Sequence, residues 1–343
     1  ENRNRNVSFI IILHPPSSML NTLTRKSFCG RATQSAARIS SVQEQRSSLH
    51  VATSIEAMRD YRAKNPSISF VPTMGALHDG HLTLVRRAKE MNSKVVVSIF
   101  VNPTQFSAGE DLDKYPRQLE ADLEKLRPLG VDCVFTPTQA DMYPGGSLCH
   151  VEPANFSHIS EGLARPDFFR GVATVVCKLF NIVQPTYTFF GQKDISQCIL
   201  IQRMVRDLNM PVIVTVCPTI RESDGLAMSS RNAYLHPVER PACNVLYKAL
   251  SAAKLYCDQT KDNRFPAKRE DIIATVNSIL RQEPLVTQIE YVSVASHRDM
   301  TELTSYSAHA AGAGAVISAA IRIGNVRLID NVLVGQAIPD ILK

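Results

Sequence analysis

The run of residues 94–101, Lys-Val-Val-Val-Ser-Ile-Phe-Val, is nearly continuous in β-branched and other apolar side chains. A strand that is apolar on both faces is typical of a parallel sheet with helices on both sides. Similar short apolar segments alternate along the chain with segments of helical periodicity. We therefore predict an α/β fold built on a doubly wound, Rossmann-like parallel sheet. The predicted strands lie at residues 70–71, 94–101, 131–136, 186–190 and 212–217, and the predicted helices at residues 53–64, 82–88, 116–129, 172–183 and 195–208.

The pattern changes beyond residue 232, where strands and helices no longer alternate simply. Predicted helices over residues 237–256 and 268–282 precede strand-like segments over residues 289–295 and 315–323. We expect a Rossmann-like nucleotide-binding domain over residues 49–220 and a smaller α+β C-terminal domain over residues 221–343. The second domain would act as a lid, with a hinge inside residues 218–232.

Residues 1–48 are expected to form a disordered N-terminal extension. Residues 1–43 hold six Arg or Lys and one acidic residue, so most of the net charge of +6 lies there and the remaining chain is close to neutral. Residues 19–43 have the composition of a mitochondrial transit peptide; the alternative is an extension without function. We expect a cytoplasmic protein, or a mitochondrial one if this peptide is functional. No apolar run approaches the ~20 residues of a membrane span, and a near-neutral body argues against a nucleic-acid partner.

Residues 69–89 predict a strand, a glycine loop and a helix. Gly75 and Gly80 let a phosphate approach the backbone, and the unpaired amides at a helix N-terminus attract anions. His78 and His81 are three residues apart, so they can project from one side and donate hydrogen bonds to a phosphoryl group. Two alternatives stay open. The pair could bind zinc, although no further Cys or His ligands occur at zinc-site spacings, or it could be a structural pair on a capped helix.

Polar clusters follow the ends of four predicted strands. His78 and His81 come after the first, Asn102 and Gln105 after the second, and two further groups follow later strands: Lys193, Asp194 and Gln197, then Arg221 and Ser229–Arg231. Ligands of doubly wound sheets bind at the carboxyl ends of the strands, so these clusters could converge on one crevice. Local alternatives remain: a helix-start ion pair at Lys193-Asp194, a cap at Ser229-Ser230 and a turn at Asn102-Pro103.

Five stretches of the chain carry recognisable motifs. They are Pro-Thr-Met-Gly-Ala-Leu-His-Asp-Gly-His (72–81), Val-Ser-Ile-Phe-Val-Asn-Pro-Thr-Gln-Phe (97–106), Glu-Asp-Leu-Asp-Lys-Tyr-Pro-Arg (110–117), Phe-Phe-Gly-Gln-Lys-Asp (189–194) and Asp-Gly-Leu-Ala-Met-Ser-Ser-Arg-Asn (224–232). In these motifs and their order, the chain from about residue 50 onward resembles the pantothenate synthetase family, the pantoate-β-alanine ligases of the HIGH nucleotidyltransferase superfamily. The resemblance implies an ATP-dependent ligase that condenses pantoate with β-alanine through a pantoyl adenylate and releases AMP and pyrophosphate. It also implies Mg²⁺ with the ATP, and a homodimer.

The resemblance further implies roles for individual residues. His81, His78 and Lys193 would be catalytic, with His81 the proton donor. Asn102, Gln105 and Gln197 would bind pantoate or β-alanine, because amides both donate and accept hydrogen bonds. Asp122 would be a Mg²⁺ ligand; the alternative is a solvated carboxylate on an amphipathic helix. The residues expected to bind ATP are Met74, Gly75, His78, His81, Gly191, Lys193, Asp194, Ile220, Met228, Ser229, Ser230 and Arg231.

The chain departs from the family pattern at three places. Gln192 stands where Glu is usual, Ile195-Ser196 replaces a more common Tyr-Gln, and Asp167-Phe168 stands where Gly-His is frequent. The last change bears on the β-alanine side of the pocket. Two other functions remain as alternatives: another adenylyl- or cytidylyltransferase of the same superfamily, and an RNA-binding module derived from a synthetase core.

Overall fold

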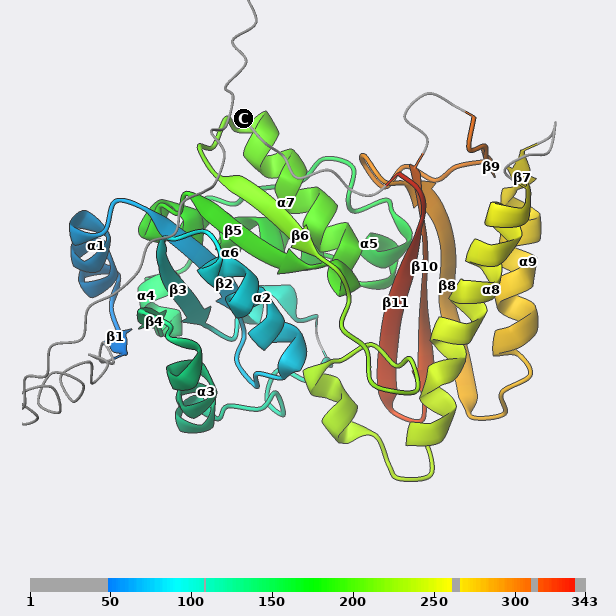
Figure 1. The fold of residues 1–343 in the computed structure, drawn as a ribbon, viewed down its shortest axis with the longest axis horizontal. Helices are drawn as coiled ribbons and strands as arrows, with labels where there is room; N and C mark the ends of the chain where they lie inside the picture. The colour runs from blue at the N-terminus through cyan, green and yellow to red at the C-terminus, as the bar shows by residue number, and fades with distance from the viewer. Residues whose placement is uncertain (1–48, 108, 261–265, 310–313, 337–343) are drawn as a thin grey trace, which may run out of the picture. The chain divides into compact units, whose positions relative to one another are not determined.

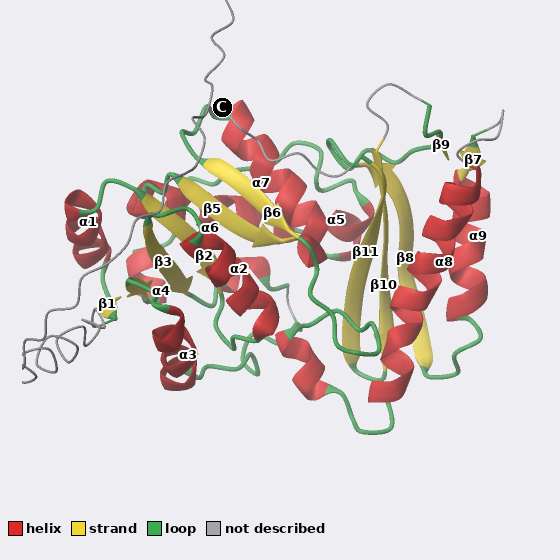
Figure 2. Cartoon of the chain, viewed as in Figure 1, coloured by secondary structure: helices red, strands yellow, loops and turns green. Residues whose placement is uncertain are grey.

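Six parallel strands form the main sheet of the computed structural model, which describes residues 49–107, 109–260, 266–309 and 314–336 (Figures 1 and 2). Each neighbouring pair of strands is parallel. This confirms the predicted α/β class, whereas the extension predicted for residues 1–48 lies outside the described residues. In spatial order the strands are β1 (His50–Ala52), β4 (Cys133–Phe135), β3 (Lys94–Ile99), β2 (Ile68–Thr73), β5 (Tyr187–Gly191) and β6 (Ile213–Cys217).

Helices cover both faces of this sheet. Strand side chains alternate between two apolar cores, so Phe70 and Val96 pack in one core while Val71 and Val97 pack in the other. Phe70 is fully buried, which stabilises the fold by about 1.5–3 kcal/mol relative to exposure. One face carries α1 (Ile55–Lys64), α6 (Phe168–Val183) and α7 (Ile195–Asp207), and the other carries α2 (Asp79–Lys89) and α3 (Leu119–Leu126).

The winding of the sheet reverses between β2 and β5. From β2 the chain passes outward to β3 and β4, then returns to β5 on the other side of β2 and continues to β6. Connections on the two sides leave a crevice beyond the carboxyl ends of β2 and β5, where ligands of such sheets bind. The sheet topology therefore places a site after Thr73 and after Gly191.

A smaller antiparallel sheet follows, with the order β11-β10-β8. Its strands are β8 (Val286–Ser296), β10 (Gly314–Ile323) and β11 (Val326–Gly335). Two helices, α8 (Val245–Thr260) and α9 (Arg269–Leu280), pack on one face through residues such as Leu250 and Ile272 (Figure 1). β11 is an edge strand. The described residues belong to one compact unit, and a domain boundary at residue 220 stays a prediction.

Several elements differ from the sequence-based expectation. α6 begins at Phe168, earlier than predicted, and so includes Gly171. Only a glycine fits at this position of the helix, because a Cβ there would lie 2.2 Å from the Thr104 carbonyl oxygen. α8 begins only at Val245, since a 3₁₀ helix with a proline near its start, Arg240–Asn244, precedes it. The elements missed altogether are β1, β11, the pair β7 (Ala267–Lys268) and β9 (Ser305–Tyr306), and the short helices α4 (Gln139–Met142) and α5 (Ser160–Ala164).

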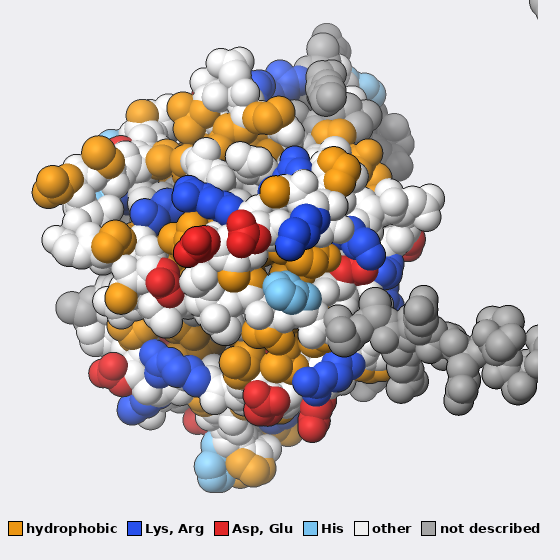
Figure 3. Space-filling model, turned by 90° about the vertical axis from the view of Figure 1, so that its left-hand side faces the viewer, with side chains coloured by type: hydrophobic (Ala, Val, Ile, Leu, Met, Phe, Trp, Pro, Cys, Tyr) orange, Lys and Arg blue, Asp and Glu red, His pale blue; other side chains and the backbone are white. Residues whose placement is uncertain are grey.

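The surface gives no single-sign charge field on the face seen in Figure 3, where acidic and basic side chains are interspersed among apolar ones. Among the described residues, none of the helices is long and apolar enough to cross a membrane.

Candidate active site

A cavity of about 1080 Å³ opens at the carboxyl ends of the main sheet. Such a volume suits a nucleotide together with a small substrate. The structure brings together nearly all of the predicted site residues, from all four strand ends, while Gly75, Asp122 and Arg221 lie outside the lining. The predicted residues that line the cavity are Met74, His78, His81, Asn102, Gln105, Gly191, Lys193, Asp194, Gln197, Ile220, Met228, Ser229, Ser230 and Arg231.

His78 and His81 cap the N-terminus of α2. The Nδ1 atom of His78 accepts the amide hydrogen of Gly80 at 3.2 Å, and Nδ1 of His81 accepts that of His78 at 3.4 Å. Gly80 is needed for this arrangement, because a Cβ there would lie 2.8 Å from the His78 ring. The structural alternative is thus realised in part: the two rings cap the helix and also line the cavity. Among the described residues no group of three or more metal-ligating side chains could hold a metal ion.

Both imidazoles are neutral at physiological pH. Burial and the nearby charge of Lys193 lower the pKa of His78 to about 4. Burial, His78 and Lys193 lower the pKa of His81 to about 3. Because Nδ1 of each neutral ring accepts an amide hydrogen, the ring proton is on Nε2, which is left as a hydrogen-bond donor.

Asp122 holds the glycine loop from behind. It is fully buried, and its two carboxylate oxygens accept the amide hydrogens of Ala76 and Leu77, each at 2.8 Å. A Cβ on Gly75, whose φ is +81°, would come within 3.1 Å of the same carboxylate. The alternative of a solvated carboxylate is therefore wrong. This position does not fit a Mg²⁺ ligand for a nucleotide in the cavity either, because the carboxylate is fully buried and lies outside the cavity lining, and the predicted metal role gains no support here.

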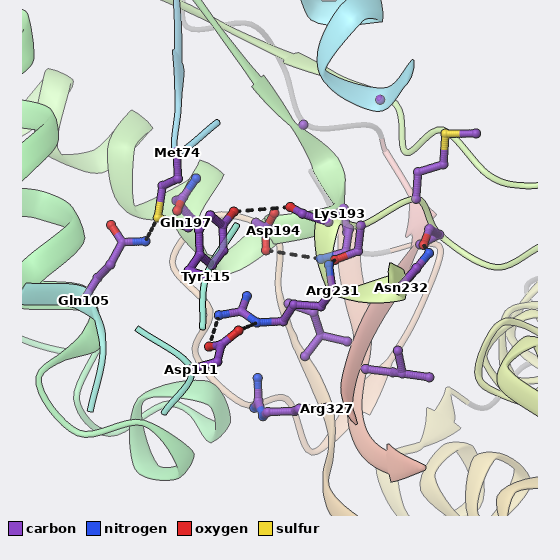
Figure 4. Close-up of a pocket in the computed structure, with 18 of the residues that line it drawn as sticks. Met74, Gln105, Asp111, Tyr115, Lys193, Asp194, Gln197, Arg231, Asn232 and Arg327 are labelled. Carbon is purple, nitrogen blue, oxygen red and sulfur yellow. Dashed lines mark hydrogen bonds and ion pairs between the residues drawn. The ribbon is translucent and has the colours of Figure 1, made fainter. Parts of the chain in front are cut away.

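Asn102 and Gln105 form a connected amide network. Asn102 is 1% exposed; its Nδ2 donates to the Gly171 carbonyl at 3.3 Å and to Gln105 Oε1 at 3.0 Å, and its Oδ1 accepts from the Tyr143 hydroxyl at 2.8 Å. Gln105 Nε2 donates to the Met74 sulfur at 3.2 Å, as Figure 4 shows. Asn102 thus fixes the orientation of Gln105, whose amide lies at the cavity wall.

Cationic side chains lie on the opposite part of the cavity wall. Lys193 pairs with Asp194 at 3.6 Å, and Ser229 caps the 3₁₀ helix Ser230–Tyr234, so both local alternatives also occur. Arg231 makes two bonds to Asp111, of 2.9 and 2.8 Å (Figure 4). Burial alone would lower the pKa of Arg231, but its bonds to Asp111 raise that pKa above its usual value.

Sequence reasoning missed the residues that hold these side chains in place. Asp111, Tyr115 and Glu110 lie in a motif that was recognised without a role, and Tyr115 contacts Ser230 at 3.2 Å between the two hydroxyls. Arg165 donates to both oxygens of Glu110, at 2.9 and 2.7 Å, and to the Gln105 carbonyl at 3.0 Å. The sequence signal that could have pointed to Glu110 and Asp111 is their position as acidic residues inside a family motif.

The structure shows what surrounds the residues that depart from the family pattern. Gln192 Nε2 donates to Asn331 Oδ1 at 3.2 Å. Asp167 adopts a positive φ of 66°, a region that glycine occupies without strain. The ring of Phe168 lies 3.8 Å from the guanidinium carbon of Arg165. For Ile195-Ser196 the structure shows a buried Ile195 at the start of α7.

Comparison with known proteins adds to this geometry. A family model described as pantoate-beta-alanine ligase matches residues 48–333. The chain is 47% identical over 279 residues to the pantothenate synthetase of Thermodesulfovibrio yellowstonii, covering 81% of this chain and 96% of that protein.

Two solved structures are also similar. Pantothenate synthetase from Thermus thermophilus has a TM-score of 0.74 and 41% identity, with 83% of this chain and 99% of that chain covered. Pantoate-beta-alanine ligase from Francisella tularensis, complexed with beta-gamma ATP and beta-alanine, has a TM-score of 0.65 and 36% identity, with 83% and 97% covered. With a family match over most of its length, the chain belongs to the pantoate-β-alanine ligase family.

Proposed function

We propose that this enzyme condenses pantoate with β-alanine to give pantothenate, by way of a pantoyl adenylate. The observation that carries the proposal is the convergence of His78, His81, Lys193 and the Met228–Arg231 segment on one cavity. The ligand-bound relative from Francisella tularensis supports ATP and β-alanine as substrates. Family membership favours this reaction over the transferase and RNA-binding alternatives.

The first step would be adenylation. The pantoate carboxylate attacks the α-phosphate of ATP, the bond to the β-phosphate oxygen breaks, and pyrophosphate leaves with the bonding electrons. The α2 N-terminus and the Nε2 hydrogens of His78 and His81 would stabilise charge on the phosphate oxygens. Since the free enzyme keeps both imidazoles neutral, this geometry supports hydrogen-bond donation by His81, and not delivery of a proton. Lys193, with a side chain 20% exposed, would supply a full positive charge.

Gln105 and Gln197 would bind pantoate, since both line the cavity and each amide offers a donor and an acceptor. Asn102 would act mainly by orienting Gln105. In the second step the amine of β-alanine attacks the acyl carbonyl, and AMP leaves. Enclosure of the adenylate would protect it from water.

The test of this function is pantoate-dependent pyrophosphate release. Purified protein given ATP, Mg²⁺ and pantoate without β-alanine should release pyrophosphate in a burst and exchange labelled pyrophosphate into ATP. Addition of β-alanine should then give steady turnover to pantothenate and AMP. Absence of both exchange and turnover would rule out the ligase proposal.

We predict that Lys193→Ala lowers the adenylation rate about 100-fold, because a charge partner of the transition state is lost. Lys248→Ala, at an exposed position of α8 outside the cavity, is the matched control and should keep full activity. Pyrophosphate exchange measures both. An unchanged rate in Lys193→Ala would mean that this lysine serves only its ion pair with Asp194.

Three further expectations stay predictions. We expect Mg²⁺ to enter with the nucleotide, and this proposal assigns no side chain as its ligand. Homodimer formation, implied by the family resemblance, is measurable by sedimentation equilibrium. Residence in the cytoplasm or mitochondria depends on whether the first 48 residues act as a transit peptide, which import of a tagged full-length chain would test.

A further inference from the structure

Asn331, in the edge strand β11, bonds to the backbone that carries Lys193. Its Nδ2 donates to the carbonyl oxygens of Gln192 at 2.9 Å and Lys193 at 3.0 Å, while its Oδ1 accepts from Gln192 Nε2 at 3.2 Å. Asn331 is 1% exposed, so these bonds are protected from water. A lysine has a long, flexible side chain, and its reach is therefore set by where its backbone is held.

Asp330 makes a second set of contacts with a different segment. Both of its oxygens accept hydrogens from Arg221, at 2.6 and 3.0 Å, and Arg221 also donates to the Gly225 carbonyl at 3.1 Å. The guanidinium carbon of Arg221 lies 3.7 Å from the ring centre of Tyr247 in α8. Asp330 is 4% exposed, so its ion pair with Arg221 is largely shielded from water. Arg221 therefore has three partners: Asp330, the Gly225 carbonyl and the Tyr247 ring.

Arg221 begins the hairpin-like segment that ends in Met228–Arg231. It forms an antiparallel bridge with Ala227, and the Met228 amide donates to the Ile220 carbonyl at 3.0 Å. Holding Arg221 therefore fixes the start of the Ser229–Arg231 segment. Consecutive strand residues project to opposite faces, so Asp330 and Asn331 reach two segments on two sides of the same edge strand.

We propose that Asp330 and Asn331 form a positioning pair that sets Lys193 and the Ser229–Arg231 segment at a fixed separation along the same part of the cavity wall. Adjacent Cα atoms are about 3.8 Å apart, so the pair acts as a short rigid link between the two cationic parts of the site. The inference rests on the proposed function, in which both parts bind the same triphosphate. Gln192, which replaces the Glu usual in the family, takes part in this contact through both its side chain and its backbone carbonyl, which bond to Asn331.

The experiment is a double-mutant cycle between Asn331→Ala and Lys193→Ala. Asn331→Ala should lower kcat for pantoate-dependent pyrophosphate release about tenfold or more, with a smaller change in the KM for ATP, because a displaced charge chiefly weakens the transition state. In the Lys193→Ala background, Asn331→Ala should reduce the remaining rate less than about twofold. Equal losses in the two backgrounds would overturn the proposal, since they would mean a general structural effect.

Two further variants keep the test decisive. Ser318→Ala removes a buried hydroxyl from β10 at the position paired with Asn331, without touching the Lys193 segment, and should keep kcat. Asn331→Thr suits a strand but is too short to reach both carbonyls, and it serves if the alanine variant does not fold. Unchanged kcat in Asn331→Thr, or a loss in Ser318→Ala as large as in Asn331→Ala, would contradict the proposal.

For Asp330, the matching cycle pairs Asp330→Asn with Arg231→Ala and expects the same non-additivity. ATP binding, measured by calorimetry without pantoate, separates the two hypotheses. If the wild type binds ATP but never forms pyrophosphate, the ligase proposal fails. The positioning pair is then still tested by ATP binding in two backgrounds. Asn331→Ala should weaken ATP binding when Lys193 is present, and it should have no further effect when Lys193 is already replaced by alanine.

Discussion

Asp122 shows how one buried carboxylate can shape the glycine loop that precedes α2. It accepts two consecutive amide hydrogens from Ala76 and Leu77. The replacement Asp122→Asn keeps the size but offers a single acceptor oxygen, so one amide loses its partner. An unsatisfied buried donor costs about 1–3 kcal/mol, and we predict that loss in the free energy of unfolding, with slower turnover and an unchanged Mg²⁺ requirement.

Chemical denaturation and Mg²⁺ titration of the rate measure this prediction. Glu124→Gln, at an exposed position of the same helix, is the control and should change neither quantity. A normal stability for Asp122→Asn combined with a raised Mg²⁺ requirement would instead support the metal-ligand role.

His78 and His81 make stability depend on pH. In the unfolded chain both titrate near pH 6.5, whereas in the folded chain their pKa values are lowered to about 4 and about 3. Between these values the unfolded chain binds protons that the folded chain does not, so stability falls as the pH falls from about 6.5. We predict that His81→Gln flattens this dependence between pH 6.5 and 4.5 in urea unfolding. His236→Gln, exposed and outside the cavity, should leave the slope as in the wild type.

At the scale of elements, short apolar runs predicted five strands of the main sheet, because those strands are largely buried, and missed the short, mostly exposed edge strand β1. β11 was missed although it is ten residues long. Its apolar alternation is interrupted by Asp330-Asn331, a pair that is typical of turns. In the structure this interruption supplies the contacts to Arg221 and Lys193. The sequence rule failed where the strand serves the site, as expected when a functional requirement overrides local pattern.

The end of α6 offers a prediction about backbone strain. Gln184 follows the helix with a φ of 47°, its amide donates to the Phe180 carbonyl at 2.8 Å, and its side chain is exposed. Glycine adopts this conformation without the cost of about 1 kcal/mol that a Cβ imposes. Gln184→Gly should therefore raise the midpoint of thermal unfolding by roughly 1–3 °C. Gln184→Ala keeps the Cβ and should not; an equal rise in both variants would contradict the explanation.

At the scale of the whole molecule, a chain of ion pairs links α5 to the C-terminal sheet. Arg327 of β11 contacts Glu161 at 3.0 and 2.7 Å and Glu290 of β8 at 2.7 Å. Burial alone would lower the pKa of Arg327, but these two carboxylates raise it above its usual value. Arg322 extends this chain of ion pairs by one more, with Glu290 at 2.8 Å.

Arg327→Met should destabilise the protein by about 1.5–3 kcal/mol, because the buried Glu161 loses two bonds to its closest cation and keeps only the longer ion pair with Arg165, at 3.7 Å. Adding Glu161→Gln should recover much of that loss. Arg322→Met is the control: its side chain is 42% exposed and Glu290 keeps Arg327, so a loss under about 1 kcal/mol is expected. Denaturant unfolding of the four proteins measures this, and equal losses for the two arginine variants would contradict it.

The meeting of four strand ends could be predicted, because parallel strands end at one edge of a sheet and a switch point marks the crevice. Contacts such as Asp111 with Arg231, or Asn331 with Lys193, could not. They join segments more than 100 residues apart through single polar side chains, and no periodicity or spacing in the sequence encodes such a pairing.

The pairing of β10 with β11 aligns Ser318 with Asn331 and Ala319 with Asp330 across a tight turn at Gly324. A slip of one residue in this hairpin would send every β11 side chain to the opposite face. The carboxylate would then meet the carbonyls beside Lys193, and the amide would meet a guanidinium. A misaligned hairpin would thus be inactive, and it would also turn Val326, Leu328, Val332 and Val334 away from the core that they share with α8 and α9. Specific activity after refolding therefore reports the fraction of molecules in which this edge strand has paired in the correct register.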